Sequence, residues 1–258
     1  MQMHGNTIFI TGGTSGIGRG LAEAFHQRGN QVIIAGRRKD RLEEICGQCP
    51  GMASFALDVT DPKAIREVAK EVIAKFSRLN CVVNNAGVQM PVAIGPDQPL
   101  DEDELQAEIG TNLLGPIRVA AAFLPHLAKH AAASQPPAVL INVSSGLAFV
   151  PMARYAVYCA TKAAIHSWTL SLRQQLRSSG IHVLELIPPY VATELGGPGK
   201  PAVATSSGRG PMPLEAFITE AMKELESGAE EIAVADAKRL VAATSPEAVQ
   251  RAFAAING

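Results

Sequence analysis

The chain has 258 residues, of which 47% are hydrophobic and 18% are charged, and its formal net charge is −1. This composition excludes a disordered or fibrous chain. A net charge near zero provides no basic surface field that would hold nucleic acid or an anionic membrane, so we expect neither as a partner. The length is typical of one α/β domain, and we expect residues 1–258 to form a single domain.

Cysteine content and the N-terminal sequence indicate the compartment. Four cysteines in a chain of this length are too few for a disulfide scaffold and favour a reducing compartment. The first apolar run, Ile8 to Ile10, is too short for a signal peptide, and no apolar stretch reaches the roughly 18 residues of a membrane helix. We therefore expect a cytoplasmic protein without membrane insertion. Cys46 and Cys49 form a lone C-x-x-C pair without neighbouring histidines, so we predict no metal site.

Short apolar runs rich in β-branched residues alternate with longer helical patterns along the chain. The predicted strands are 7–11, 31–35, 53–57, 81–84, 139–143 and 181–187, with a short one at 232–235. The predicted helices include 17–28, 61–77, 101–130 and 155–179, and further helices follow the strand 232–235 and end at Asn257. Apolar strands separated by helices are typical of βαβ units with a parallel sheet. We therefore predict an α/β, doubly wound, Rossmann-type fold with helices on both faces and ligands at the carboxyl ends of the strands.

The turn between the first predicted strand and helix is rich in glycine and reads T-G-x-x-x-G-x-G from Thr11 to Gly18. Glycines at such a turn permit positive φ and let backbone N–H groups approach a pyrophosphate at the helix N-terminus. The turn is not a P-loop, because Arg19-Gly20 stands where Lys-Ser/Thr is required, and Leu21 breaks the G-x-G-x-x-G pattern. Its position at the first βα junction favours dinucleotide binding, and a simple tight turn is the alternative.

The end of the second predicted strand bears on the choice of dinucleotide. An acidic residue about 20 positions beyond the glycines would bind the ribose hydroxyls of NAD. Here no Asp or Glu lies between Gln31 and Lys39, and Arg37-Arg38 follow the strand. A guanidinium can hold a 2′-phosphate with two N–H bonds, whereas a carboxylate would repel it. The sequence therefore favours NADP over NAD, with two solvated arginines at the start of a helix as the alternative.

Tyr158 and Lys162 are four residues apart in a helical pattern, so they share a helix face about 6 Å apart along the axis. A phenol has a pKa near about 10, which a neighbouring ammonium and a positively charged nicotinamide would lower towards about 7. Ser145 follows the strand 139–143 and precedes Tyr158 by thirteen residues, a loop that can fold its hydroxyl against the phenol. The absence of G-x-S-x-G and S-x-x-K motifs argues against a hydrolase.

Three further motifs follow in the same order: Leu57-Asp58-Val59-Thr60, Asn84-Asn85-Ala86-Gly87, and Asn112 within Thr111-Asn112-Leu113-Leu114-Gly115. Together with the glycine turn, Ser145 and the Y-x-x-x-K pair, they resemble the single-domain short-chain dehydrogenase/reductase family over about residues 5–193. After the last long strand the family usually has Pro-Gly, whereas this chain has Pro188-Pro189. That departure, together with the segment from Met212 to Phe217, is similar to the DltE-like branch of the family.

The resemblance implies a role for each polar residue of this set. Tyr158 would be the general acid that protonates a carbonyl oxygen during hydride transfer, or the base in the reverse direction. Lys162 would lower the pKa of Tyr158 and hold the nicotinamide ribose. Ser145 would orient the carbonyl, and Asn112 would hold a water that links Lys162 to bulk solvent.

The resemblance also implies which residues bind the cofactor. Since Pro189 lacks an N–H group, contacts to the nicotinamide amide would come mainly from Val191 and Thr193. The implied cofactor residues are Gly12, Thr14, Ser15, Gly16, Ile17, Gly18, Arg37, Arg38, Asp58, Val59, Asn85, Ala86, Gly87, Tyr158, Lys162, Pro188, Val191 and Thr193.

Two longer segments complete the sequence-based hypothesis. Residues 194–213 are dense in Gly, Pro, Ser and Thr and follow the last long strand, which predicts a substrate lid, with a surface insertion as the alternative. The alanine-rich helices 112–130 and 155–179, with the resemblance, imply a homodimer through a four-helix interface, and ordinary core packing is the alternative.

We predict an NADP(H)-dependent oxidoreductase that transfers a hydride between the nicotinamide and a carbonyl or secondary alcohol. Apolar residues after Ser145, namely Leu147, Phe149, Val150 and Met152, favour a hydrophobic small-molecule substrate. NAD(H) is the less favoured cofactor. The alternative from another functional class is a catalytically idle NADP-binding regulator that senses redox state.

Overall fold

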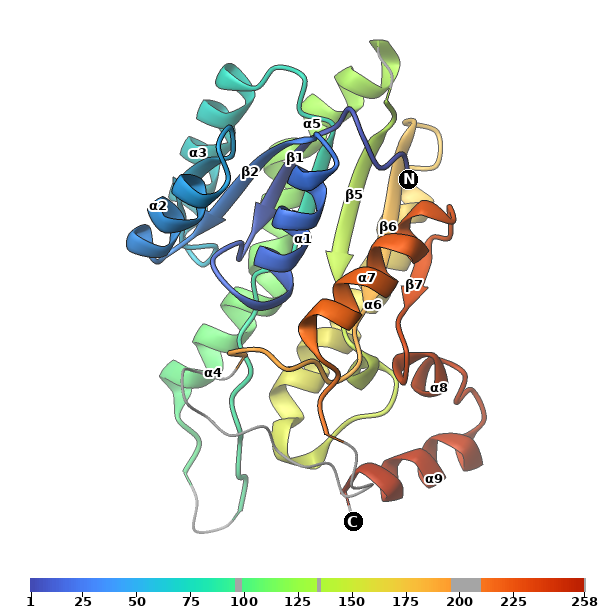
Figure 1. Ribbon diagram of the computed structural model, residues 1–258. Coiled ribbons are helices and arrows are strands. Elements are labelled where there is room, and N and C mark those ends of the chain that lie inside the picture. Colours follow the sequence, from blue (N-terminus) through green and yellow to red (C-terminus); the bar gives the residue numbers. More distant parts are fainter. Residues whose placement is uncertain (96–98, 134–135, 196–209, 258) are drawn as a thin grey trace.

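A parallel sheet of seven strands runs through the middle of the computed structural model, which describes residues 1–95, 99–133, 136–195 and 210–257 (Figure 1). The order β3-β2-β1-β4-β5-β6-β7 reverses direction between β1 and β4. This arrangement confirms the predicted doubly wound α/β fold, and its reversal point is where such folds bind ligands. The strands are β1 Thr7–Thr11, β2 Gln31–Gly36, β3 Ala53–Ala56, β4 Cys81–Asn84, β5 Ala138–Val143, β6 Ile181–Ile187 and β7 Glu231–Ala233.

Helices cover both faces of the sheet and form two hydrophobic cores. The helices are α1 Gly16–Gln27, α2 Lys39–Gln48, α3 Pro62–Lys75, α4 Glu102–Ile109, α5 Gly115–Ala133, α6 Ala156–Gln175, α7 Leu214–Glu226, α8 Ala237–Val241 and α9 Pro246–Asn257. One core packs α1, α2 and α7 against the sheet, and the other packs α3, α5 and α6. In β1, Ile8 and Ile10 belong to the first core and Phe9 to the second, as the alternation of side chains along a strand requires.

The helix predicted over 101–130 is two helices joined by a π-helical turn. Asp101 begins α4 by accepting the N–H groups of Asp103 and Glu104 at 3.0 Å each. The π-helical turn, Gly110–Leu114, then separates α4 from α5. Such turns are rare and often lie at functional sites. The turn contains Asn112, one of the residues predicted for the catalytic site.

Helices α2 and α7 were not predicted. In α2 only Leu42 and Ile45 are buried, so the apolar stripe is narrow and the charged residues around it hide the helical period. In α7 the buried residues Phe217, Ala221 and Leu225 recur every four positions, which is a usable signal. It was missed because α7 directly follows the segment rich in glycine and proline.

The predicted lid over 194–213 lies largely outside the described residues, which exclude 196–209. Its flanks are held together, since the N–H of Ala192 donates to the carbonyl of Met212 at 2.9 Å and the N–H of Met212 to that of Tyr190 at 2.8 Å. Across the described parts of the chain, no helix combines the length and the apolar character needed to span a membrane.

Candidate functional site

The glycine turn and the N-N-A-G motif meet where β1 and β4 end. The Thr11 hydroxyl oxygen accepts the N–H groups of Asn85 at 3.0 Å and Ala86 at 3.1 Å. The Asn85 amide in turn donates to the carbonyl oxygens of Thr11 at 3.0 Å and Gly12 at 3.3 Å. Gly12 has a φ of +68°, and a Cβ atom on it would lie 2.8 Å from the Cα of Ala86. Only glycine therefore allows the two motifs to approach this closely.

The glycine turn leads into the N-terminus of α1, which begins at Gly16. Gly16 has a φ of +52°, and Ser15, which precedes α1, makes no side-chain cap to it. The N–H groups of the first turn and the positive end of the helix dipole suit a phosphate. A Cβ atom on Gly16 would lie 3.2 Å from the Thr193 side chain, so the segment after β6 crosses this turn. The turn therefore fits the pyrophosphate of a dinucleotide.

Tyr158 and Lys162 lie together on α6, as their spacing predicts. Both side chains are buried, and the Lys162 ammonium nitrogen lies 5.6 Å from the centre of the Tyr158 ring. Lys162 Nζ donates to the carbonyl oxygen of Val143, at the end of β5, at 2.8 Å. The Ser145 hydroxyl accepts the N–H of Leu147 at 3.1 Å, and its interaction with the Tyr158 phenol lowers the pKa of that phenol. The structure therefore brings Ser145, Tyr158 and Lys162 into one buried group.

Burial dominates the acidity of this group. It raises the pKa of the Tyr158 phenol above its usual value, while the hydrogen bond with Ser145 acts in the opposite direction. Burial also lowers the pKa of Lys162 to about 8, against the carboxylates of Glu185 and Glu108, which raise it. The ammonium of Lys162 faces the Tyr158 ring and donates to Val143. That Lys162, together with a positively charged nicotinamide, lowers the pKa of Tyr158 stays a prediction.

Asn112 reaches the same group from the π-helical turn. Its Oδ1 accepts the N–H of Val88 at 2.9 Å, and its Nδ2 donates to the Val88 carbonyl at 2.8 Å and to the Thr161 hydroxyl at 3.2 Å. A Cβ atom on Gly87 would lie 3.4 Å from Asn112 Oδ1 and 3.8 Å from Lys162 Nζ. Gly87 therefore lies beside both Asn112 and Lys162, which places the N-N-A-G motif next to the buried group.

The remaining predicted residues lie after β3, after β6 and at the start of α1. Asp58 accepts the N–H of Thr60 at 2.9 Å and its hydroxyl at 2.8 Å, after the end of β3, and Val59 beside it is buried. The Pro188 carbonyl accepts the N–H of Gly146 at 2.9 Å, which ties the end of β6 to the residue after Ser145. Val191 is buried beside Met212, and Ile17 packs against the first core.

A buried polar row beneath this centre was missed in the sequence. Asn84, Asn142 and Glu185 lie in register on β4, β5 and β6. Glu185 is 0% exposed, and its Oε2 lies 2.8 Å from His166 Nδ1. Within the described residues, Glu185 Oε1 has no hydrogen-bond partner. A lone carboxylate in the apolar strand 181–187 was the available signal, because an unpaired glutamate is rarely fully buried.

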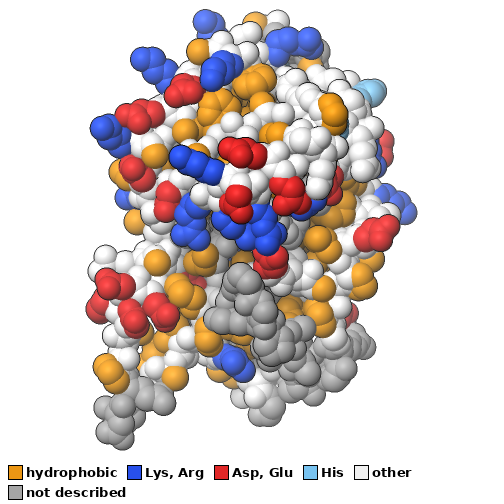
Figure 2. Space-filling model, turned by 60° about the vertical axis from the view of Figure 1, so that its left-hand side comes forward, with side chains coloured by type: hydrophobic (Ala, Val, Ile, Leu, Met, Phe, Trp, Pro, Cys, Tyr) orange, Lys and Arg blue, Asp and Glu red, His pale blue; other side chains and the backbone are white. Residues whose placement is uncertain are grey.

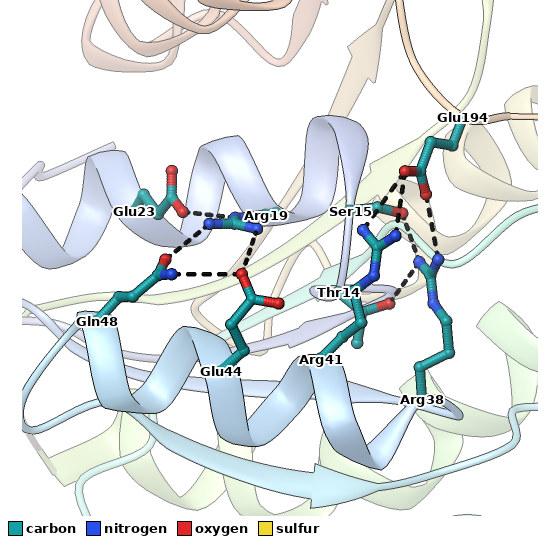
Figure 3. A network of polar contacts seen from close by, with 9 residues as sticks. All are labelled: Thr14, Ser15, Arg19, Glu23, Arg38, Arg41, Glu44, Gln48 and Glu194. Carbon is teal, nitrogen blue, oxygen red and sulfur yellow. Dashed lines mark hydrogen bonds and ion pairs between the residues drawn. The ribbon is translucent and has the colours of Figure 1, made fainter. Parts of the chain in front are cut away.

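Of the two arginines after β2, Arg38 reaches the glycine turn. Its Nη2 donates to the hydroxyl oxygens of Thr14 at 2.9 Å and Ser15 at 2.7 Å (Figure 3). Arg37 is exposed. Arg41, one turn further along α2, was not predicted, although its spacing from Arg38 places both on one helix face. Both Arg38 and Arg41 pair with Glu194.

The comparisons with known proteins agree with this geometry. A family model described as short chain dehydrogenase matches residues 6–202. An "Uncharacterized oxidoreductase DltE" of Bacillus subtilis is 42% identical over 198 residues, which are 76% of this chain and 75% of that protein.

Similar folds have been solved with either nicotinamide cofactor. A short chain dehydrogenase from Burkholderia cenocepacia in complex with NADP is 25% identical, with a TM-score of 0.79 over 98% of this chain and 99% of that one. A 3-ketoacyl-(acyl-carrier-protein) reductase from Brucella melitensis complexed with NADH is 25% identical, with a TM-score of 0.75 over 96% and 94%.

Proposed function

The chain belongs to the short-chain dehydrogenase family, in its DltE-like branch, and on this premise we propose that it is an NADP(H)-dependent oxidoreductase acting on a carbonyl or secondary alcohol. The observation that carries the proposal is the buried group of Ser145, Tyr158 and Lys162 beside the glycine turn. An acid, a hydrogen-bond donor and a cation in one desolvated place are what the reduction of a carbonyl requires.

In the reductive direction, bound NADPH would supply the hydride that the carbonyl carbon accepts. Tyr158 donates its phenolic proton to the carbonyl oxygen, and the Ser145 hydroxyl orients that oxygen and stabilises its developing charge. A phenol has an ordinary pKa of about 10, and burial raises that of Tyr158, so the phenol carries its proton at neutral pH, which is the state that a general acid needs. Lys162 holds the nicotinamide ribose, and Asn112 holds the water through which Lys162 is linked to bulk solvent, so that the proton given up by Tyr158 is replaced.

The other residues of the predicted set bind the cofactor in this proposal. Gly12, Thr14, Ser15, Gly16, Ile17 and Gly18 hold the pyrophosphate at the N-terminus of α1. Asp58 and Val59 would contact the adenine, Asn85–Gly87 would line the cofactor, and Pro188, Val191 and Thr193 would contact the nicotinamide amide.

The preference for NADP(H) rests on the arginines after β2. Arg38 lies on the glycine turn with Arg41 beside it, and Arg37 remains a predicted third contact to the 2′-phosphate. Guanidinium groups favour that phosphate, and α2 begins without the strand-end carboxylate that would bind the ribose hydroxyls of NAD.

The proposal extends to substrate, assembly and compartment. An apolar small-molecule substrate remains the prediction from Leu147, Phe149, Val150 and Met152, although Val150 is fully buried and Phe149 packs on His166. A homodimer through α5 and α6 remains the prediction from their alanine-rich sequences. A single domain over residues 1–258, a substrate lid over 194–213 and a cytoplasmic location complete the proposal.

The experiment is a panel of aldehydes and ketones incubated with the purified protein and NADPH that carries deuterium at C4 of the nicotinamide. We expect NADPH consumption with apolar carbonyl compounds and one deuterium on the carbinol carbon of each product, detected by mass spectrometry. No consumption with any member of the panel would contradict the proposal and favour the redox-sensing alternative.

A further inference from the structure

Glu194 pairs with the two arginines of the proposed cofactor site from a distant part of the chain. Its Oε2 lies 3.1 Å from Arg38 Nη1, and its Oε1 lies 3.4 Å from both terminal nitrogens of Arg41 (Figure 3). The hydrogen bond from Arg38 and the charge of Arg41 keep the pKa of Glu194 below its usual value, so the carboxylate is ionised at neutral pH. An anion that belongs to the chain itself therefore occupies this pair of guanidinium groups.

The arrangement of Arg38 makes it an anion subsite. Its Nη2 is fixed on the hydroxyl oxygens of Thr14 and Ser15, which leaves Nη1 for the anion. A guanidinium binds carboxylate and phosphate oxygens with the same planar geometry. On the face turned forward in Figure 2, basic and acidic side chains lie next to one another, so anion binding depends on local clusters and not on a broad basic surface.

We propose that Glu194 is a built-in competitor for the 2′-phosphate of NADP(H): its carboxylate holds the Arg38–Arg41 subsite, NADP(H) displaces it, and NAD(H) leaves it in place. The inference rests on the proposed function. A phosphate monoester carries about −1.5 to −2 charges at neutral pH, against one for a carboxylate, so the phosphate prevails on two guanidinium groups. The adenosine ribose of NAD carries a hydroxyl there and has no charge with which to displace Glu194.

Displacement of Glu194 also acts on the segment after β6. Thr193, the preceding residue, lies against Gly16 at the start of α1, where the pyrophosphate is proposed to bind. Thr193 therefore lies at the proposed pyrophosphate position, and Glu194, the next residue, lies at the proposed 2′-phosphate position. Occupation of the 2′-phosphate position removes the ion pairs that hold Glu194.

The exposure of the pairs limits the size of the effect. The side chains of Arg38, Arg41 and Glu194 are 38%, 34% and 39% exposed. Ion pairs with this exposure change an equilibrium constant by only a few-fold each, because water and salt screen them. The competition is therefore weak enough for the cofactor to overcome, and it remains measurable as a difference in affinity.

The test is the variant Glu194→Gln, which keeps the shape of the side chain and removes its charge. We expect the dissociation constant for NADPH to fall about three- to tenfold and that for NADH to stay unchanged. 2′-AMP should bind more tightly to the variant by the same factor, and 5′-AMP equally to both proteins, by titration calorimetry. The matched control is Glu43→Gln, an exposed carboxylate of α2 two residues from Arg41, which should alter none of these constants.

The variant Arg38→Ala separates the failure of this proposal from the failure of the proposed cofactor. NADPH and 2′-AMP binding that Arg38→Ala does not weaken would overturn the assignment of the 2′-phosphate and the competition with it. Binding that depends on Arg38 but is unchanged or weaker in Glu194→Gln would overturn the competition alone. Weaker NADH binding in Glu194→Gln would also overturn it, since Glu194 would then serve the ribose hydroxyl.

Discussion

Two charged clusters at the same edge of the sheet differ in how far water reaches them. Lys162 and Glu185 are 5% and 0% exposed, and burial sets the pKa of Lys162 at about 8. Arg38 and Glu194 are 38% and 39% exposed, and their ion pairs lie in contact with water. A change of charge in the buried cluster alters which protons are held, whereas a change in the exposed cluster alters only which anion is bound. The first cluster therefore suits chemistry, and the second suits the selection of a cofactor.

The largest effect that sharpens this contrast is expected from Arg38→Ala. The variant loses charge-assisted hydrogen bonds to the 2′-phosphate, and we expect NADPH binding to weaken about 10- to 100-fold. NADH binding should change less than about threefold, because an exposed pair contributes little. Nicotinamide fluorescence measures both constants.

Arg37→Ala is the matched comparison for Arg38→Ala. Arg37 is the neighbouring arginine and is exposed, so we expect its replacement to weaken NADPH binding by a smaller factor. Equal losses for NADPH and NADH in Arg38→Ala would refute the assignment of the 2′-phosphate to this cluster.

A smaller effect, of a different kind, is expected in the buried cluster from Glu185→Gln. Lys162 is surrounded by Tyr158 and His166 on its own helix, Glu185 on β6 and Glu108 on α4, and burial lowers its pKa to about 8 against the two carboxylates. Removal of the Glu185 charge destabilises the ammonium and lowers this pKa further. The fall of kcat/KM at alkaline pH should therefore move to lower pH by about one unit. The activity at about pH 6 should stay close to that of the wild type.

The control for that variant is Glu231→Gln. Glu231 lies in register with Glu185 on β7 but is exposed, and it pairs with Arg173 at 3.5 Å. Its pH profile should match that of the wild type, measured between about pH 6 and 9. An unchanged pH profile of kcat/KM in Glu185→Gln would contradict the assignment of this charge to Lys162. The same shift of the profile in Glu185→Gln and Glu231→Gln would contradict it too.

The sequence predicted those parts of the fold that depend on local patterns. The strands β1, β4 and β6 were predicted residue for residue, because each is an apolar run that helices cover on both faces. The meeting of Ser145, Tyr158 and Lys162 followed from helix geometry and from the order of strands and motifs. Parallel strands end at one edge, so residues after β5 and on α6 had to lie close together.

The rest depended on contacts between distant residues and on burial. Glu194 is 156 residues from Arg38, and only the path of the chain after β6 reveals their pairing. The direction in which the pKa of Tyr158 is displaced depends on how little water reaches the phenol, which spacing on a helix does not specify. The π-helical turn around Asn112 is a departure of the backbone from the period that a helical pattern assumes.

The measurement that tests the account most directly compares Tyr158→Phe with Tyr155→Phe, three residues earlier, using NADPH and the best carbonyl substrate of the panel. The phenol of Tyr158 is assigned the proton transfer, so its removal should reduce kcat at least about 100-fold while NADPH binding persists. Tyr155→Phe should keep the wild-type rate. Wild-type turnover by Tyr158→Phe would contradict the account, whatever cofactor the arginines select.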